Sequence, residues 1–408
     1  MHPPAPAEPG RLTAVRAANI FDGDRVRGPG TVFMRQGVIT GVETANTAPP
    51  CDAAVHELGP GSFLLPGLID AHSHLCWNAG PDAVAAVTAD PQATLHANVR
   101  AAAARALRAG ITTVRDLGDR DYAVVAVRDA AAPRRHELPE LLAAGPPLTT
   151  PRGHCHFLGG GTAGAHALRR AVRERFDRGC HTVKVMASGG SVTPGSDPSL
   201  RQFTADELRA VAEQAHALGM NTAAHAHAPA AILDAARAGF ATVEHVSFMT
   251  GDRFRPRAAV IDALVSAGTF ASLTAGDVCA DRAAAPPLAA KMLQCLATVL
   301  PPLRAAGARI VLGSDAGIGP TKPHDALVEG VRDAVRLGVD GAAALRMVTG
   351  EAAEACGVQG RKGRLAPGAD ADLLVLGADP VLDMAALTEV RGVYRLGHPV
   401  HGHDAAPL

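Results

Sequence analysis

The stretch "TLHANVRAAAARALRAGITTVRDLG", residues 94–118, joins an Ala-rich helical segment to a short apolar run. The helical part closes on Gly110, and glycine is the residue that most often follows the C-terminus of a helix. Residues 111–117 then form an apolar run with the length of a buried strand. A helix followed closely by a buried strand is the repeating element of α/β folds, so this stretch predicts one α/β unit.

The same pattern recurs through the middle of the chain. The segments "TADELRAVAEQAHALG" (204–219) and "APAAILDAARAG" (228–239) also have helical composition and also end on Gly. Apolar runs alternate with such segments at residues 64–71, 111–117, 141–145, 182–187, 222–226, 242–246, 269–273 and 308–313. Eight strands that each precede a helix are typical of a (β/α)8 TIM barrel. An open doubly wound sheet is the alternative, but no G-x-G-x-x-G motif follows an early strand.

Both ends of the chain have a different sequence pattern. Residues 12–65 contain short β-like runs separated by Gly and Asn, and residues 370–377 and 390–400 repeat this pattern. These ends are too short to be separate domains, so we expect them to pair into one small β-sandwich. The predicted class is therefore α/β, with residues 67–360 in the TIM barrel and residues 1–66 and 361–408 in the β-sandwich domain.

Composition excludes several classes of partner. Lys and Arg number 39 against 40 for Asp and Glu, and only 3% of the residues are aromatic. This balance favours neither nucleic acid nor an anionic membrane. No apolar run approaches the roughly 20 residues that cross a bilayer, and the N-terminus lacks the pattern of a signal peptide, so we expect a cytoplasmic protein. A small-molecule substrate is therefore the expected partner, and the sequence is also compatible with a homo-oligomer.

Ionisable side chains recur where the predicted barrel strands end. They are His72 and His74 in "PGLIDAHSHL", Lys184 in "TVKVMASGG", His225 and His227 in "NTAAHAHA", His245 in "TVEHVSF" and Asp315 in "RIVLGSDAG". Residues two apart on a strand point to the same side, so each His-x-His pair can face one metal ion. Catalytic groups of a barrel meet at the C-terminal ends of its strands. Such groups on five strands are far less expected by chance than any one of them.

These motifs resemble the amidohydrolase superfamily of metal-dependent barrel hydrolases. The tail "GRLAPGADADLLVLGADPV" (363–381) carries the resemblance further, so that it covers nearly the whole chain, from about Ala14 to Val400. Within the superfamily, "VKVMASGGSVTPGSDP" and "TTVRDLG" look most like the imidazolonepropionase-like and Xaa-Pro dipeptidase (prolidase-like) branch.

The resemblance implies a binuclear metal site. His72 and His74 would bind the first metal, and His225 and His245 the second. An ammonium has no lone pair for a metal, and in the family the lysine equivalent to Lys184 is carboxylated by CO₂, so that its carbamate bridges both ions. A plain lysine beside a single metal is the alternative. Zinc is the default ion for such ligands, although manganese, iron or cobalt could take its place.

Four residues are candidates for the chemistry itself. Asp315 would contact the first metal and carry the proton from the metal-bound water to the leaving nitrogen. His154, in "TPRGHCHFLGGG", would be catalytic through a hydrogen bond to the substrate carbonyl or oxyanion. His227, where relatives often carry Tyr, is a candidate substrate contact. Arg115 could bind a substrate carboxylate, and a structural pair with Asp116 or another acid is the alternative.

The predicted reaction is hydrolysis of an amide C–N bond by a metal-bound hydroxide. The substrate would be an Xaa-Pro-type dipeptide, an N-acyl amino acid or a related amide. After "FLGGG" the chain reads Thr162-Ala163-Gly164, where relatives often carry an acid, so dipeptidase specificity does not transfer directly. Three alternatives remain: the same metal site could act on a lactone or cyclic amide or deaminate a C–N bond, Lys184 could form a Schiff base, or the protein could bind metal or ligand without catalysis.

Overall fold

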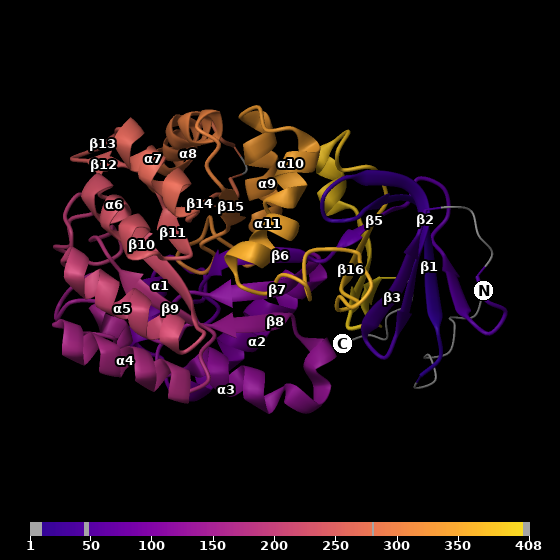
Figure 1. The fold of residues 1–408 in the computed structure, drawn as a ribbon, viewed down its shortest axis with the longest axis horizontal. Coiled ribbons are helices and arrows are strands. Elements are labelled where there is room, and N and C mark those ends of the chain that lie inside the picture. The colour runs from indigo at the N-terminus through magenta and orange to yellow at the C-terminus, as the bar shows by residue number, and fades with distance from the viewer. Residues whose placement is uncertain (1–9, 45–48, 280, 403–408) are drawn as a thin grey trace.

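The computed structural model describes residues 10–44, 49–279 and 281–402, and its larger part alternates strands with helices (Figure 1). The strands of this part are β6 (Leu68–Ser73), β7 (Ile111–Asp116), β8 (Glu140–Ala143), β9 (Thr182–Met186), β10 (Asn221–Ala226), β11 (Thr242–His245), β14 (Phe270–Thr274) and β15 (Ile310–Gly313). Each predicted apolar run therefore contains a strand. The prediction of an α/β fold is confirmed.

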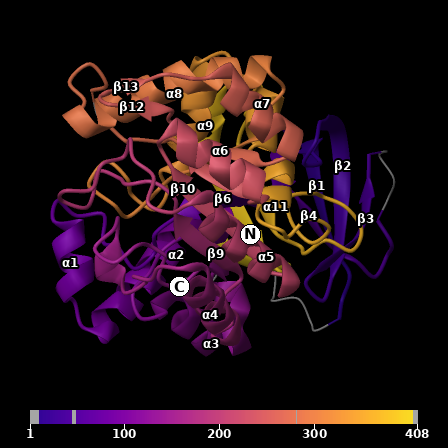
Figure 2. The ribbon, with the colours of Figure 1, turned by 60° about the vertical axis from the view of Figure 1, so that its left-hand side comes forward.

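Helices follow these strands along the chain and surround them in two views (Figures 1 and 2). They are α1 (Ala83–Ala89), α2 (Gln92–Arg108), α3 (Ala123–Ala130), α4 (Ala165–Asp177), α5 (Ala205–Ala217), α6 (Pro229–Ala238), α7 (Ala258–Ala267), α8 (Pro287–Ala305), α9 (Leu327–Arg336), α10 (Gly341–Arg346) and α11 (Gly350–Ala355). The three Ala-rich segments form α2, α5 and α6. Thr204 and Glu207 start α5 with a reciprocal capping box, in which each side chain accepts from the backbone N–H of the other. No helix of the described residues is long and apolar enough to cross a membrane.

The strands of the larger part lie in two parallel sheets. One sheet has the order β6-β7-β8, and the other has the order β15-β14-β11-β10-β9. Single parallel bridges connect the sheets at both seams, between Ser73 and Ala316 and between Leu148 and Val185. The continuous hydrogen-bonded ladders stop at these seams, so a closed barrel stays a prediction.

The predicted run at 64–71 belongs to two sheets. Its first half lies in β5 (Phe63–Pro66), in the smaller part of the molecule, and β6 begins at Leu68. Gly67 joins them and donates its N–H to the Asp372 carbonyl at 2.9 Å. A Cβ at this position would lie 2.1 Å from Thr112 Oγ1, so only glycine fits this crossing. One uninterrupted apolar run therefore covers two buried strands.

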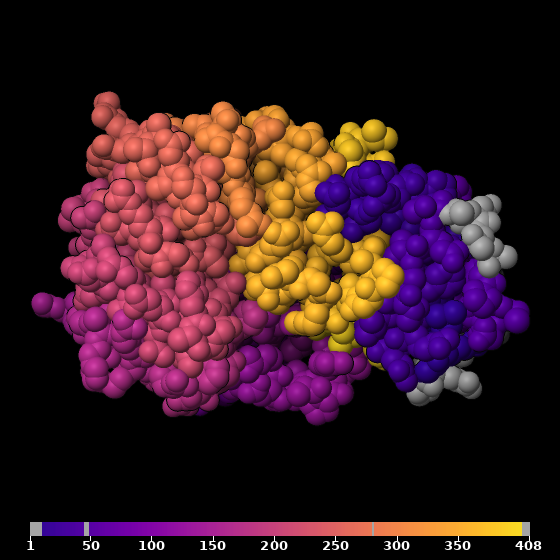
Figure 3. Space-filling view, viewed as in Figure 1, coloured from indigo at the N-terminus to yellow at the C-terminus, as the bar shows by residue number. Residues whose placement is uncertain are grey.

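Strands from both ends of the chain form the smaller part. They are β1 (Thr13–Phe21), β2 (Val26–Arg35), β3 (Val38–Glu43), β4 (Ala54–Glu57), β5, β16 (Leu373–Leu376), β17 (Val390–Arg395) and β18 (His398–Gly402). β5 pairs antiparallel with β16, which joins the two ends. The space-filling view shows the C-terminal residues in yellow between the indigo N-terminal strands and the rest of the molecule (Figure 3).

The expected β-sandwich differs from this arrangement. The described strands form one continuous sheet of order β18-β17-β16-β5-β1-β2-β3, with β4 also paired to β1, instead of two separate sheets. The coarser expectation of a small β part made from both ends agrees with the structure. The strands enclose their own apolar cluster, which includes Val15, Val32, Leu64, Leu373 and Tyr394.

Deletion of residues 361–408 tests this pairing. The deletion removes β16, β17 and β18, so it exposes the hydrogen-bonding edge of β5 and the buried side chains that faced β16. We expect insoluble protein, measured as the soluble fraction after expression and by size-exclusion chromatography. A soluble and active truncated protein would contradict the architecture.

Candidate active site

One cavity collects eight of the nine residues that the sequence singled out. It has a volume of about 250 Å³ and lies at the C-terminal ends of the central strands. The eight residues are His72, His74, His154, Lys184, His225, His227, His245 and Asp315. All eight are buried, although none of them is an apolar residue.

The first group in the cavity consists of His72, His74 and Asp315. The Nε2 atoms of His72 and His74 lie 3.4 and 3.2 Å from Asp315 Oδ1. The Nδ1 atoms of the same rings lie 3.0 Å from Glu244 Oε2 and 3.2 Å from the Gly118 carbonyl. A carboxylate and a carbonyl only accept hydrogen bonds, so each Nδ1 carries a proton. Burial lowers the pKa of His72 to about 4, so that ring is neutral. The Nε2 lone pair of neutral His72 therefore faces the Asp315 carboxylate oxygen, and a cation between these two acceptors would stabilise them.

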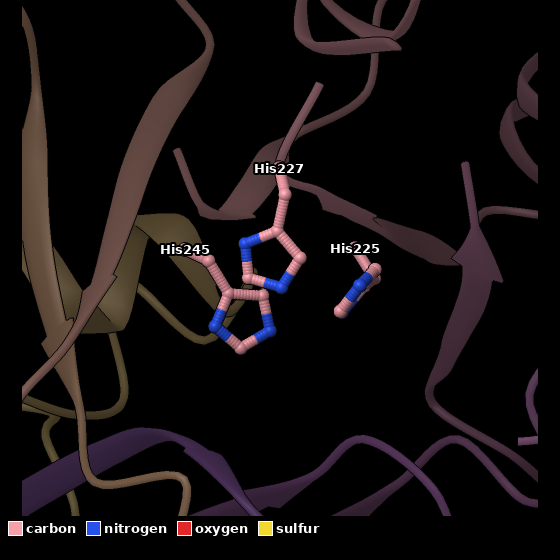
Figure 4. A group of neighbouring side chains, drawn as sticks. All are labelled: His225, His227 and His245. Carbon is pink, nitrogen blue, oxygen red and sulfur yellow. The ribbon is translucent and has the colours of Figure 1, made fainter. Parts of the chain in front are cut away.

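The second group consists of His225, His227 and His245 (Figure 4). One ring nitrogen of each lies within 4.8 Å of the others, the spacing that could hold a metal ion. His225 donates Nε2–H to the Gly189 carbonyl at 3.0 Å, which leaves its Nδ1 lone pair available. His245 Nδ1 lies 3.1 Å from Thr274 Oγ1, which leaves Nε2 toward the group. Protein groups that orient the far nitrogen are typical of histidine metal ligands.

His227 is part of the same group, whereas the sequence suggested only a substrate contact. Its Nδ1 lies 2.8 Å from Ser247 Oγ, and its backbone N–H donates to Ser188 Oγ at 2.9 Å. The ring stacks on that of His245, with centroids 4.7 Å apart and planes at 24°. These contacts fix the orientation of the His227 ring, and its Nε2 points away from Ser247.

Lys184 lies between the two groups on β9. The side chain is 1% exposed, and Nζ lies 3.4 Å from His72 Nε2. No carboxylate of the described residues is within ion-pair distance of Nζ, which leaves an ammonium poorly compensated. Burial lowers the pKa of Lys184 to about 8, while Glu244 and Asp315 act in the opposite direction. The neutral amine, which is the form that reacts with CO₂, is therefore more available than for an ordinary lysine.

Glu244 is a site residue that the sequence reasoning missed. It is fully buried, and its two oxygens accept from His72 Nδ1 and from the Arg115 guanidinium, each at 3.0 Å. Burial raises the pKa of Glu244, but Arg115 and His72 outweigh this effect and hold the pKa below its usual range. The signal in the sequence was "TVE": residues 242 and 244 share one face of the strand, so the carboxylate points inward beside His72.

Arg115 does not line the cavity. Its guanidinium is fully buried and donates to Glu244 and to the Ala71 carbonyl, the latter at 2.7 Å. The expected role as an anchor for a substrate carboxylate has no support in this position. The alternative, a structural pair with an acid, is what the structure has, although the acid is Glu244. Asp116 instead accepts from the backbone N–H groups of Leu75 and Gly118.

His154 approaches the cavity from the loop after β8. Its backbone N–H donates to Gln202 Oε1 at 2.6 Å, and its ring centroid lies 4.7 Å from that of His225. Within the described part of the chain, its buried Nδ1 has no hydrogen-bond partner. Burial, followed by the charge of His227, lowers the pKa of His154 to about 3, so the ring is neutral. His154 lines the cavity, where its ring N–H can donate a hydrogen bond to a bound oxygen atom.

Two residues of the site have a strained backbone. His245 has φ +68° and Asp315 has φ +55°, in the left-handed region that non-glycine residues rarely occupy. Such residues cost on the order of 1–3 kcal/mol and cluster at functional sites. Asp315 is held by its backbone N–H, which donates to the His72 carbonyl at 2.7 Å. The neighbouring Ser314 donates its N–H and hydroxyl to Asp70, at 2.9 and 2.5 Å.

Comparison with known proteins now identifies the family. The sequence model of the amidohydrolase family matches residues 63–400 of this chain. This chain belongs to the amidohydrolase family. The match spans the groups described above, and it confirms the resemblance seen in the sequence. The chain is accordingly a hydrolase that acts on C–N bonds.

Solved structures of similar fold support the prolidase-like branch. A putative prolidase from Bifidobacterium longum is 26% identical, with a TM-score of 0.79 over 98% of this chain and 97% of that one. A Xaa-Pro dipeptidase with methionine bound in its active site is 24% identical, with a TM-score of 0.84 over 96% and 100% of the two chains. Ochratoxinase of Aspergillus niger is 40% identical over 85 residues, which cover 21% of this chain and 18% of the ochratoxinase.

Substitution of Gly190 tests the position of His154. A Cβ at Gly190 would lie 2.3 Å from His154 Nε2, so Gly190→Ala should displace the ring. We expect kcat to fall by about 10²–10³-fold, the scale for loss of one oxyanion contact, and we expect the same fall in His154→Ala. Metal content should be unchanged. Gly161→Ala is the matched control, because its Cβ would have 3.8 Å to the nearest atom. A Gly190→Ala variant with the parental kcat would exclude a role for the His154 ring.

Proposed function

We propose that the chain is a binuclear metal-dependent amidohydrolase that cleaves the amide bond of an Xaa-Pro-type dipeptide, an N-acyl amino acid or a related amide. The observation that carries this proposal is the set of imidazole lone pairs. His72 and His225 are neutral rings that each donate one N–H to a carboxylate or a carbonyl, so their other nitrogen is unprotonated. Unprotonated nitrogens, an ionised carboxylate and a buried lysine form a donor set that fits metal ions.

The two groups divide the ligands between two ions. His72, His74 and Asp315 would hold the first ion, and His225 and His245 would hold the second. Lys184, as a carbamate, would bridge them. Zinc is the default choice for imidazole and carboxylate ligands in this number. When bound, the ions would lower the pKa of a water molecule and polarise the amide carbonyl.

The chain's own residues would supply positioning and proton transfer. Burial raises the pKa of Asp315, but His72 and His74 more than offset this and hold it well below its usual range. The carboxylate is therefore ionised, so it can take the proton of the attacking water and deliver it to the amide nitrogen. The His154 ring lines the cavity and would donate an N–H to the carbonyl oxygen as its negative charge develops. His227 would contact the substrate beside His245.

The proposed chemistry also supports a closed barrel. Ligands on or directly after β6, β9, β10, β11 and β15 converge on one cavity, as at the C-terminal face of a barrel. The single bridges between Ser73 and Ala316 and between Leu148 and Val185 lie where the two sheets would close. We propose that residues 67–360 form this barrel and that residues 1–66 and 361–408 contribute the β domain.

A substrate screen with parallel metal analysis tests the proposal. We expect about two divalent ions per chain and turnover of at least one Xaa-Pro dipeptide or N-acyl amino acid. Lys184→Ala should lose metal and activity, because the bridging ligand is absent, and short-chain carboxylic acids should restore part of both. A parental protein with one ion by metal analysis and an unmodified Lys184 amine in a high-resolution density map would refute the binuclear site.

Asp315→Asn separates metal binding from proton transfer. The histidines and the Lys184 carbamate remain in this variant, so most of the metal should be retained. Turnover should fall by about 10²–10⁴-fold, the usual contribution of a general acid–base group. Metal content and kcat are measured on the same sample. Near-parental turnover would assign the proton transfer to another residue.

A further inference from the structure

A second buried ion pair lies in the wall of the cavity, apart from the proposed metal ligands. Lys322 Nζ lies 3.1 Å from Asp277 Oδ2, and both side chains are 3% exposed. Both residues line the cavity that contains Asp315. Lys322 follows β15 and Asp277 follows β14, so the pair comes from loops, whereas most of the proposed ligands lie on strands or directly after them.

The ammonium of Lys322 has one donor to spare. An ammonium carries three N–H groups. The Ala275 carbonyl accepts at 3.2 Å, and Asp277 is the partner of the ion pair. The described residues provide no third acceptor. Asp277 is itself held by Thr321, whose hydroxyl donates to Oδ1 at 2.8 Å. The carboxylate therefore fixes the position of the ammonium, and the remaining donor is available to a bound group.

Lys322 is also the cation best placed for an anionic substrate. Among the described lining residues, Lys184 and Lys322 are the only lysines or arginines, and Lys184 belongs to the proposed metal site. Lys291 lines a small neighbouring cavity, but its side chain is 38% exposed and its nearest carboxylate, Asp252, is 4.0 Å away at the surface. Water screens such an exposed charge, whereas a buried one binds more strongly.

Apolar side chains also line the cavity that contains Lys322. Leu288, Met292 and Ile318 are among them. Apolar lining residues, together with the spare donor of the Lys322 ammonium, suit a molecule with an apolar side chain and one carboxylate. An N-acyl amino acid or a dipeptide with a free C-terminal carboxylate has both features.

We propose that Lys322 binds the free carboxylate of the substrate and that Asp277 is the positioning residue that holds it. The preferred substrates are then amides of amino acids with a free and ionised α-carboxylate, and neutral amides are poor substrates. The expected effect on turnover rests on the proposed amide hydrolysis. The ammonium–carboxylate contact itself is a binding property and is measurable without turnover.

Binding of N-acetyl-L-leucine and N-acetyl-L-leucinamide to the metal-loaded protein provides the test, by calorimetry together with kcat/KM for each compound. The parental protein should favour the free acid by about 10–100-fold, the range for a hydrogen bond to a charged group. Lys322→Met should remove this preference by weakening binding of the acid alone. Lys291→Met is the matched control and should keep the preference.

A double variant guards against misfolding. Lys322→Met leaves Asp277 as an unpaired buried charge, which can destabilise the protein. Asp277→Asn/Lys322→Met removes both charges and should fold, as thermal melting would show, yet still lack the preference. Equal binding of acid and amide by the parental protein overturns the inference, and so does an equal loss for both compounds in the variants. Preference for the acid that depends on Lys322, without hydrolysis of either compound, supports the inference and contradicts the proposed function.

Discussion

The buried ion pair between Arg115 and Glu244 determines how the strands of the site are held together. Arg115 lies on β7, Glu244 on β11, and the guanidinium also donates to the Ala71 carbonyl on β6. Both side chains are fully buried, so loss of either partner would leave an uncompensated charge, at a cost of about 3–5 kcal/mol. The pair has a further effect, because the second Glu244 oxygen accepts from His72 Nδ1 and so fixes the tautomer of that ring. One interaction therefore connects three strands and orients a proposed metal ligand.

The other histidines follow the same principle with different partners. Gly118 and Gly189 provide backbone carbonyls for His74 and His225, and Thr274 provides a hydroxyl for His245. A carbonyl at the end of a strand cannot rotate, so it sets the ring orientation through the fold itself. The neutral state of His72 and His225 has a different cause, which is their burial. Burial lowers the pKa of His72 to about 4, and that of His225 is lowered as well.

The sequence predicted the strands well because each buried strand is an apolar run with a helix after it. It failed at 64–71, where two buried strands meet at Gly67 and no polar residue marks the change of sheet. The candidate ligands were found because histidines two apart at strand ends stand out against apolar neighbours. Glu244, the partner of Arg115, was missed because the pair joins residues 129 positions apart, and only the arrangement of the strands brings them together. Local patterns do not carry such information.

The proposed metal ligands and the Lys322–Asp277 pair differ in the kind of element that carries them. The proposed ligands lie on strands or directly after them, where the hydrogen-bonded ladder fixes each backbone position. Lys322 and Asp277 lie on loops, and the loops are tied to each other by Thr321 and by the Val278 N–H, which donates to the Thr321 carbonyl at 2.8 Å. Strand-borne residues suit a metal centre because its geometry must not vary, whereas loops can change between relatives without loss of the core. The chemistry of this chain is therefore recognisable from its motifs, while its choice of substrate depends on contacts between loops that no motif describes.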